Sequence, residues 1–416
     1  MPNNAVEPRA DARVAPRPER GLWRLFGPAF VAAVAYVDPG NVAANLTAGS
    51  QYGYLLLWVL VVANAMAVLV QYLSAKLGLV TGRTLPQLIG ERLGRRSRIA
   101  FWAQAEIVAA ATDIAEVIGG ALALNLLFGV PLPLGGLIVG AVSMTLLAIH
   151  SRRGQRTFEF VIIGLLVIIA VGFTAGIFFA PVNWPDAAAG LIPRFAGPAT
   201  VVLAASMLGA TVMPHAIYLH SALARDRHGS SAAGLPRLLR ATRLDVAWSM
   251  LAAGGVNIAM LLLAAASLRG VPGTESIEGA HAALATELGP RIATVFAIGL
   301  LASGLAATSV GAHAGVVIMD GLLMRRIPLM VRRAVTLAPA LVLLAAGVNP
   351  TWALVMSQVV LSLGIPFALI PLVRLTSLRT LLGDYANRRV TTGAAIAVAG
   401  LIVALNAVLI VLTIAG

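Results

Sequence analysis

The feature of this sequence that most constrains its fold is a succession of apolar runs, each about 20 residues long. A helical run of this length matches the hydrocarbon thickness of a bilayer. Hydrophobic residues make up 59% of the 416-residue chain and charged residues only 11%, whereas roughly 25% of a soluble domain is charged. The mean hydropathy is +0.89, and the alternating pattern of a membrane β-barrel is absent. We therefore predict an all-α integral membrane protein.

Eleven spans are predicted, so the two termini should lie on opposite sides of the membrane. The predicted spans cover residues 27–49, 53–78, 99–128, 133–150, 158–180, 200–224, 244–268, 291–320, 334–348, 352–373 and 392–415. Of the 30 Lys and Arg residues, 27 fall on the side of the N-terminus, and only Arg194, Arg269 and Arg291 do not. Because basic loops stay in the cytoplasm, we expect a cytoplasmic N-terminus and an extracytoplasmic C-terminus. The strong preference for Arg over Lys favours a bacterial inner-membrane protein.

The net charge and the missing cysteines exclude several classes of protein. The net charge of +13 is explained by basic loops that face an anionic leaflet, so no nucleic-acid partner is predicted. The chain has no cysteine for disulfides or thiolate metal sites. No nucleotide-binding loop, nucleophile–base pair or zinc triad is present, so we do not expect an enzyme. Residues 1–22 resemble a disordered cytoplasmic tail, and residues 23–416 a single transmembrane domain.

Two predicted spans are interrupted by helix-breaking residues. The first contains "DPGN", with Asp38, Pro39, Gly40 and Asn41, and the sixth contains "TVMPHA", with Pro214. Paired breaks in two halves of a chain indicate the midplane site of a transporter with inverted repeats. We therefore predict that helices 1 and 6 are unwound at mid-membrane. The two repeats would cover residues 27–180 and 200–373, and the span at 392–415 would be an addition; ordinary proline kinks are the simpler alternative.

The residues at these breaks predict a site for a transition-metal cation. A carboxylate in mid-bilayer costs about 2.5–3.5 kcal/mol on insertion scales, so Asp38 should face a cavity and have a partner. Asn41 adds an amide oxygen, Met213 a thioether, and unwinding exposes the carbonyls of Ala35 and Ala210. A thioether among oxygen ligands favours Mn²⁺, Fe²⁺ and later metals over Mg²⁺ and Ca²⁺. Plain packing of the Met side chain is the alternative.

Three uncharged polar residues are further candidates within the spans. Gln358 is expected either to complete the metal shell or to close the outer gate. Thr112 and Asn257 are similar gating candidates. For each residue taken alone, hydrogen bonding between helices is the more common role.

A line of acids in the third span predicts a proton pathway. Glu106, Asp113 and Glu116 are spaced by seven and three residues, which places them near one stripe of a helix. Such acid chains carry protons in membrane proteins. Arg332 and Arg333, which open the ninth span, are their natural counter-charges, and purely structural ion pairs are the alternative.

Two histidines follow Met213 in the sixth span. His215 is next to the predicted site and can take or orient a proton near neutral pH. His220 could do so nearer the cytoplasm, although packing is at least as good an explanation. Their spacing of five residues makes the two imidazoles diverge on a helix, which excludes a zinc-hydrolase pair.

Several motifs resemble the natural resistance-associated macrophage protein (Nramp) family of divalent-metal transporters. These motifs are "DPGN" and "MPH" at the two breaks, "TDIAEVIG" in the third span, "RRAVTLAPAL" in the ninth and "SQVVLSLGIPFALIPL" in the tenth. The resemblance implies a leucine-transporter-type fold and proton-coupled import of Mn²⁺ or Fe²⁺ by alternating access. The metal would be the transported substrate, with no cofactor and no obligatory protein partner. A metal channel, uniporter or sensor without proton coupling is the alternative.

The resemblance also implies roles for individual residues. The metal ligands would be Asp38, Asn41, Met213 and the carbonyls of Ala35 and Ala210. The implied proton route comprises Asp38, His215, Glu116, Asp113, Glu106, Arg332 and Arg333. This sequence has Ala216 where the family usually has Asn, a position that is not among the ligands. Relatives that carry magnesium or aluminium would be expected to differ at the thioether, so Met213 argues against those substrates.

Overall fold

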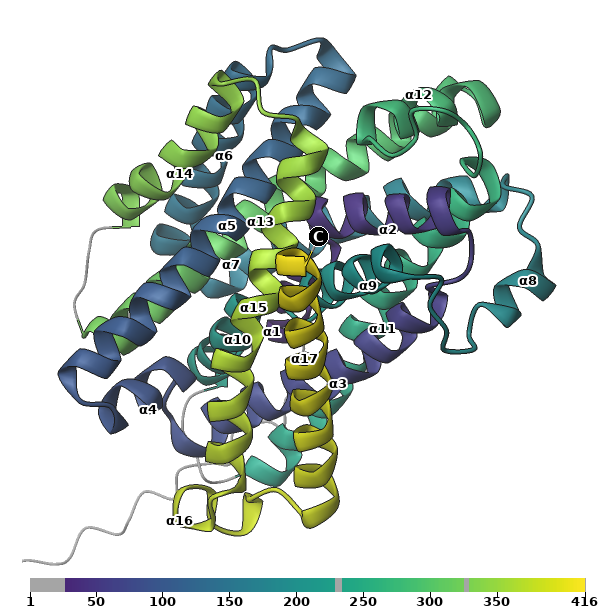
Figure 1. Cartoon of the computed structure of the whole chain (residues 1–416). Helices are drawn as coiled ribbons and strands as arrows, with labels where there is room; N and C mark the ends of the chain where they lie inside the picture. Colours follow the sequence, from purple (N-terminus) through teal and green to yellow (C-terminus); the bar gives the residue numbers. More distant parts are fainter. Residues whose placement is uncertain (1–26, 229–233, 325–328, 416) are drawn as a thin grey trace, which may run out of the picture.

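Long apolar helices packed side by side form the computed structural model, which describes residues 27–228, 234–324 and 329–415 (Figure 1). No strand occurs within these ranges. The predicted N-terminal tail at 1–22 lies outside the described residues. The all-helical membrane architecture predicted from the apolar runs is confirmed.

Within the described ranges, nine helical segments are long and apolar enough to cross a membrane. Seven of these segments are single helices, and the other two are described in the next paragraph. The seven are α3 (Leu57–Thr81), α5 (Arg95–Phe128), α6 (Leu132–Arg153), α11 (Leu235–Ser267), α13 (Pro290–Leu323), α15 (Pro350–Ser377) and α17 (Arg389–Ala415). Several extend beyond the predicted bounds because the helical conformation continues past the apolar run into polar sequence. The largest such extension is at α11, which begins nine residues before the predicted span at 244–268.

The remaining predicted spans are shorter or interrupted. The first is divided into α1 (Pro28–Val34), a 3₁₀ turn η2 (Ala35–Val37) and α2 (Pro39–Tyr52). The sixth is divided into α9 (Pro198–Thr211) and α10 (Pro214–His228). The fifth, α7 (Gln155–Thr174), ends in the 3₁₀ turn η3 (Ala175–Phe178), and the ninth is α14 (Leu329–Ala345), with 17 residues. Length and apolarity alone therefore support nine of the eleven predicted spans.

Short helices connect the long ones. They are α4 (Leu85–Arg92), α8 (Trp184–Ala189), α12 (Ile277–Glu287), α16 (Arg379–Leu382) and the 3₁₀ turn η4 (Gly383–Tyr385). Thr84 caps α4 through a capping box, because its hydroxyl accepts the Gln87 N–H while the Gln87 side chain accepts the Thr84 N–H. Helices α8 and α12 lie on one side of the bundle, and α4 and α16 lie on another (Figure 1).

Helices α5 and α13 form the centre of the bundle because small residues let their backbones approach. A Cβ added at Gly304 of α13 would stand 2.7 Å from the Cα of Gly120 in α5. Membrane helices commonly pack through small residues in this way, since lipid supplies no hydrophobic force between them. The chain's interrupted helices α1, α2, α9 and α10 all contact this central region or its neighbours α11 and α15. The two breaks therefore lie inside protein.

Candidate functional site

The first break is built by Asp38 and the two residues that follow it. After the 3₁₀ turn at Ala35–Val37 the backbone of Asp38 is extended, with φ −73° and ψ 168°. Pro39 then occupies the first position of α2, where its missing N–H costs no hydrogen bond and its fixed φ suits a helix. Asp38 is the N-cap of α2, which gives its carboxylate a structural role that the sequence analysis did not consider.

Side chains from two other helices satisfy the carbonyl groups that this break releases. The Asn257 amide of α11 donates to the Tyr36 carbonyl at 2.6 Å. The Ser303 hydroxyl of α13 donates to the Val37 carbonyl at 2.6 Å. Asn257 also accepts a hydrogen bond from Asn45 of α2 at 2.8 Å. These bonds hold the break in place, since an unpaired backbone carbonyl in an apolar interior is costly.

The Asp38 carboxylate is fully buried, and only one of its oxygens is used. Oδ1 accepts the Asn41 backbone N–H at 2.7 Å and the Asn41 side-chain amide at 2.9 Å. Oδ2 has no hydrogen-bond partner among the described residues. A buried carboxylate oxygen without a donor requires a cation or a proton to compensate its lost hydration.

Asn41 connects the first break to the second. Its side-chain N–H group donates to the Ala210 carbonyl of α9 at 2.7 Å, while its Oδ1 is buried without a partner in the described chain. Two residues, Val212 and Met213, separate α9 from α10, and both are fully buried. The structure therefore brings Asp38, Asn41 and the Ala210 carbonyl together. Met213 lies in the break between α9 and α10.

Gln358 of α15 packs onto the same break. A Cβ at Gly40 would stand 1.7 Å from Gln358 Nε2, so only glycine leaves room for this side chain. Gln358 is fully buried, and within the described ranges its Oε1 has no hydrogen-bond partner. The candidate residues are shielded from solvent, since each is at most 1% exposed: Ala35, Asp38, Asn41, Ala210, Met213 and Gln358.

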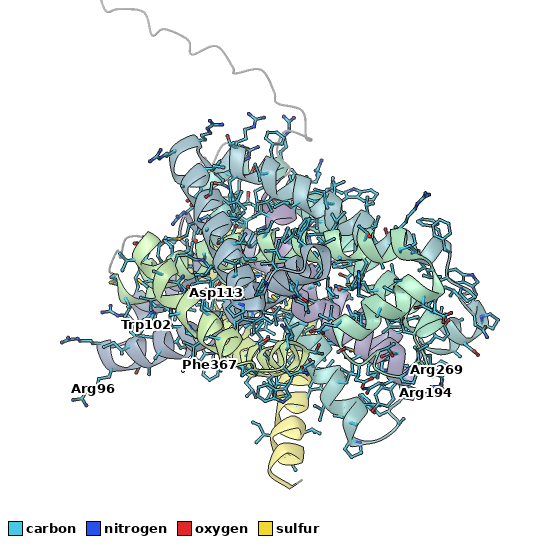
Figure 2. All side chains as sticks on the ribbon, turned by 90° about the horizontal axis from the view of Figure 1, so that it is seen from above. Arg96, Trp102, Asp113, Arg194, Arg269 and Phe367 are labelled. Atoms are coloured by element: carbon cyan, nitrogen blue, oxygen red, sulfur yellow. The ribbon has the colours of Figure 1, made fainter. Side chains whose placement is uncertain are left out.

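The acids of α5 meet the two arginines of α14. Arg332 pairs with Glu106 at 2.7 Å, and Arg333 pairs with Asp113. Arg333 is fully buried. Glu116 is also fully buried, and neither of its carboxylate oxygens has a hydrogen-bond partner among the residues described. The three acids thus differ in their partners, because Glu106 and Asp113 form ion pairs and Glu116 does not. The position of Asp113 in the molecule is labelled in Figure 2.

The two histidines of α10 lie in different surroundings. His215 Nδ1 is 3.5 Å from the hydroxyl of Thr112, which also donates to the Val108 carbonyl. His220 Nδ1 is 2.7 Å from Gln71 Oε1, and the Gln71 amide donates to the Tyr36 hydroxyl at 2.6 Å. His215 therefore lies next to the acid-bearing helix α5, whereas His220 belongs to a chain of hydrogen bonds that ends at the first break.

Sequence reasoning missed four residues that take part in these contacts. They are Tyr36, Asn45, Gln71 and Ser303. Asn45 lies four residues after Asn41 on the same helix, a spacing that indicates a shared face. Ser303 gave no such signal, because a serine in a membrane helix usually bonds a carbonyl of its own helix.

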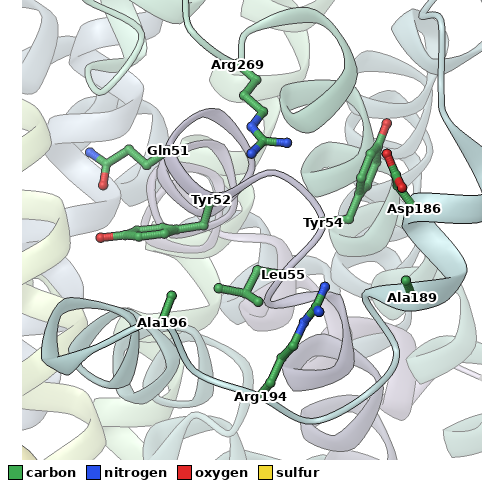
Figure 3. Close-up of a pocket in the computed structure, with 9 residues that line it drawn as sticks. All are labelled: Gln51, Tyr52, Tyr54, Leu55, Asp186, Ala189, Arg194, Ala196 and Arg269. Atoms are coloured by element: carbon green, nitrogen blue, oxygen red, sulfur yellow. The ribbon is translucent and has the colours of Figure 1, made fainter.

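A cavity of about 390 Å³ near the end of α2 is a poor candidate for cation binding. Arg194 and Arg269 both line it, together with Gln51, Tyr54 and Asp186 (Figure 3). Two cationic side chains repel a divalent cation more strongly than one exposed carboxylate attracts it. Nor do three His, Asp or Glu side chains converge as a metal site anywhere in the described ranges. The two breaks remain the best candidate site.

Known proteins are similar to this chain over nearly its whole length. A family profile described as "Natural resistance-associated macrophage protein-like" matches residues 29–412. The divalent metal cation transporter MntH of Mycobacterium tuberculosis is 61% identical over 397 residues, which cover 95% of this chain and 92% of that protein.

Solved structures agree with this similarity. A crystal structure of a manganese transporter from Eremococcus coleocola has a TM-score of 0.84 at 32% identity, covering 92% of this chain and 85% of that chain. MHP1, a nucleobase-cation-symport-1 family transporter, has a TM-score of 0.59 at 17% identity, covering 92% and 89% of the two chains, and is similar in fold alone. The leucine-transporter-type fold predicted from the sequence is thereby confirmed.

The hydrogen bonds that hold the first break predict a difference between two serines of α13. Ser303→Ala leaves the buried Val37 carbonyl without its donor and should lower the free energy of unfolding by about 1–3 kcal/mol. Ser309→Ala is the matched control, because the Ser309 hydroxyl bonds the Leu305 carbonyl of its own helix. Unfolding of the purified protein in mixed micelles measures both effects. Equal destabilisation by the two variants would contradict a special role for Ser303.

Proposed function

Because the chain belongs to the natural resistance-associated macrophage protein-like family, we propose that it imports Mn²⁺, and also Fe²⁺, into the cytoplasm. Its MntH relatives are divalent metal cation transporters, and its structural neighbour from Eremococcus coleocola is a manganese transporter. Transport proceeds by alternating access, in which the broken helices open the site first to one side of the membrane and then to the other. The metal ion is the substrate, and no cofactor is required.

The observation that carries this proposal is a set of three buried oxygens without donors. Asp38 Oδ2, Asn41 Oδ1 and Gln358 Oε1 have no hydrogen-bond partner among the described residues. All three belong to residues at or against the first break. Orphaned acceptors of this kind are destabilising in an apolar interior unless a cation binds them. One carboxylate with neutral oxygens and a thioether is a donor set suited to Mn²⁺ or Fe²⁺.

We assign the metal ligands to Asp38, Asn41, Met213 and the carbonyls of Ala35 and Ala210, with Gln358 completing the shell. Asn41 must change its bonds to bind metal. Its side-chain NH₂ group donates both to Asp38 and to the Ala210 carbonyl, and a cation that binds these two oxygens displaces that NH₂ group. Rotation of the amide then turns Oδ1, which has no partner in the described chain, toward the metal.

We assign the proton pathway to the buried acids and histidines beside the site. Asp38, His215 and Glu116 are its inner members, and the ion pairs of Asp113 with Arg333 and of Glu106 with Arg332 continue it along α5. Glu116 is the pivotal member because it is buried without a hydrogen bond inside the described structure and can exchange a proton without breaking an ion pair. His220 is a secondary candidate through Gln71. Thr112, Asn257 and Gln358 are proposed to act in gating.

The proposed direction of transport follows the distribution of charge. A cytoplasmic N-terminus places the basic loops inside, and an inside-negative potential then favours entry of cations by about 2.3 kcal/mol per charge per 100 mV. The repeats at 27–180 and 200–373 would supply one broken helix each, and the helix at 392–415 would lie outside them. Within this arrangement protons and metal move down the same electrical gradient.

Replacing Asp38 tests the position of the site. Asp38→Asn keeps an N-cap side chain for α2 but removes the charge, so Mn²⁺ affinity should fall by at least about a hundredfold. Asp245→Asn is the matched control, because Asp245 is also buried and accepts backbone N–H bonds at the start of a broken span. Calorimetric titration of the purified proteins measures the affinity. Wild-type affinity in Asp38→Asn would remove the metal site from this break.

Replacing Met213 tests the role of the thioether. Met213→Ala should retain Mn²⁺ uptake but admit Ca²⁺ and Mg²⁺ as competitors, since only the soft ligand favours transition metals over alkaline earths. Met250→Ala is the control for loss of packing, because both methionines are fully buried. Competition assays in proteoliposomes measure selectivity. Unchanged selectivity in Met213→Ala would show that this side chain only packs.

Replacing Glu116 tests proton coupling. Glu116→Gln should allow Mn²⁺ uptake into proteoliposomes without acidifying their interior, because an amide cannot carry the proton. Glu159→Gln, a second buried acid outside the proposed pathway, should behave like the wild type. An internal pH reporter measures both. If wild-type protein carries metal with no acidification, the protein is a uniporter and the acids of α5 are structural.

A further inference from the structure

A second cavity, far in sequence from the breaks, lies where α4, α5 and α15 meet. Its volume is about 380 Å³. Its walls combine exposed apolar side chains with two arginines, Arg92 at the end of α4 and Arg374 in the last turn of α15. We call this cavity the interfacial groove. It lies at the end of the apolar span Pro350–Ser377, where a membrane helix passes from hydrocarbon into the headgroup region.

Both charged side chains that the structure describes in the interfacial groove are positive. No Asp or Glu is among the described residues that line it. Neither Arg92 nor Arg374 forms an ion pair with any described residue. One N–H of Arg92 donates a hydrogen bond to the Leu88 carbonyl of its own helix. The neighbouring acid Glu91 is already paired with Arg83. Two guanidinium groups at the rim of one cavity are therefore available to an anion from outside the chain.

The apolar part of the interfacial groove is suited to a hydrocarbon chain. The apolar wall is formed by Phe101 of α5, by Ile370 and Pro371 of α15, and by Leu378 at the end of α15. Ile370 is 51% exposed and Leu378 is 37% exposed. Phe101 packs edge-on against Phe367, with ring centroids 6.1 Å apart, which joins α5 and α15 at this place. In Figure 2, Arg96 and Trp102 of α5 lie at the opposite edge of the molecule from Arg194 and Arg269.

We propose that the interfacial groove binds an anionic phospholipid, with its phosphate on Arg92 and Arg374 and one acyl chain along Phe101 and Ile370. Basic pockets between membrane helices at the cytoplasmic side are typical sites for anionic headgroups. Arginine suits this role because its planar fork contacts two phosphate oxygens at once. A free phosphate ion would use the two arginines but gain nothing from the apolar wall. The acyl chain of a zwitterionic lipid would cover the apolar wall, but its headgroup would place a positive charge next to the arginines.

Native mass spectrometry of the detergent-purified full-length protein tests this proposal. Phosphatidylglycerol and phosphatidylcholine with identical acyl chains are titrated onto the wild type and onto the variant R92Q/R374Q. Wild type should bind phosphatidylglycerol in preference to phosphatidylcholine. Loss of both arginines should weaken phosphatidylglycerol binding roughly thirtyfold and remove the preference.

The variant R379Q/R388Q is the matched control. It removes the same charge from two exposed arginines that do not line the interfacial groove, so it should bind phosphatidylglycerol like the wild type. If phosphatidylglycerol binding is weakened equally in both double variants, the effect is due to general surface charge and the proposed site is wrong. Unchanged binding in R92Q/R374Q would also overturn it. Displacement of the lipid by millimolar inorganic phosphate would show that the arginines serve a soluble anion instead.

Discussion

The buried carboxylate of Asp38 is the constraint on which the rest of this structure depends. A charged group in an apolar interior is tolerated only when the protein, a proton or an ion compensates its lost hydration. The chain provides part of that compensation by starting α2 at Asp38, so that the N–H of Asn41 and the positive end of the helix face Oδ1. This arrangement requires the helix to stop before Asp38, and the break in turn requires donors for the carbonyls that it releases. Asn257 and Ser303 supply them from α11 and α13.

The polar atoms around the break fall into two groups. The carbonyls of Tyr36 and Val37 are bonded to helices that pack in the centre of the bundle. In contrast, the oxygens at Asp38 Oδ2, Asn41 Oδ1 and Gln358 Oε1 have no donor among the described residues. The first group fixes the backbone of the break, and the second comprises the oxygens that we propose as metal ligands. A fixed backbone lowers the entropy lost when a ligand binds, so that at Asn41 only the side-chain amide has to rotate.

Sequence reasoning identified the residues whose chemistry is unusual for a membrane helix. Charged and amide groups are rare in apolar spans, which is why Asp38, Asn41 and the acids of α5 stood out. The "RR" pair at the start of the predicted ninth span suggested the counter-charges of these acids. Ser303 could not be distinguished from Ser309 by its sequence context. One hydroxyl bonds a carbonyl of another helix and the other bonds its own helix. That difference depends on how α13 faces the first break, which no local pattern specifies.

Helix lengths were also only partly predictable. The apolar run predicted a span at 334–348, whereas α14 is 17 residues long, begins five residues earlier at Leu329 and includes the two arginines in its first turns. Asn257 was predicted as a gating candidate, and its hydrogen-bond partners, the Tyr36 carbonyl and Asn45, could not be predicted. Local sequence can show that an amide is present in a span, but its partner is determined by the crossing of helices that are distant in the chain.

The amide of Asn41 has a consequence for turnover of the proposed carrier. Its two N–H bonds reach Asp38 and the Ala210 carbonyl, so the partial positive charge of the amide lies between oxygens from both broken helices. A carrier that has released its cargo must close again without a cation to join these helices. The Asn41 amide connects the two broken helices through its own hydrogen bonds. An aspartate at the same position could not do so because it has no N–H to donate. In the proposed transport cycle, asparagine at position 41 would therefore let the empty carrier return without a second metal ion.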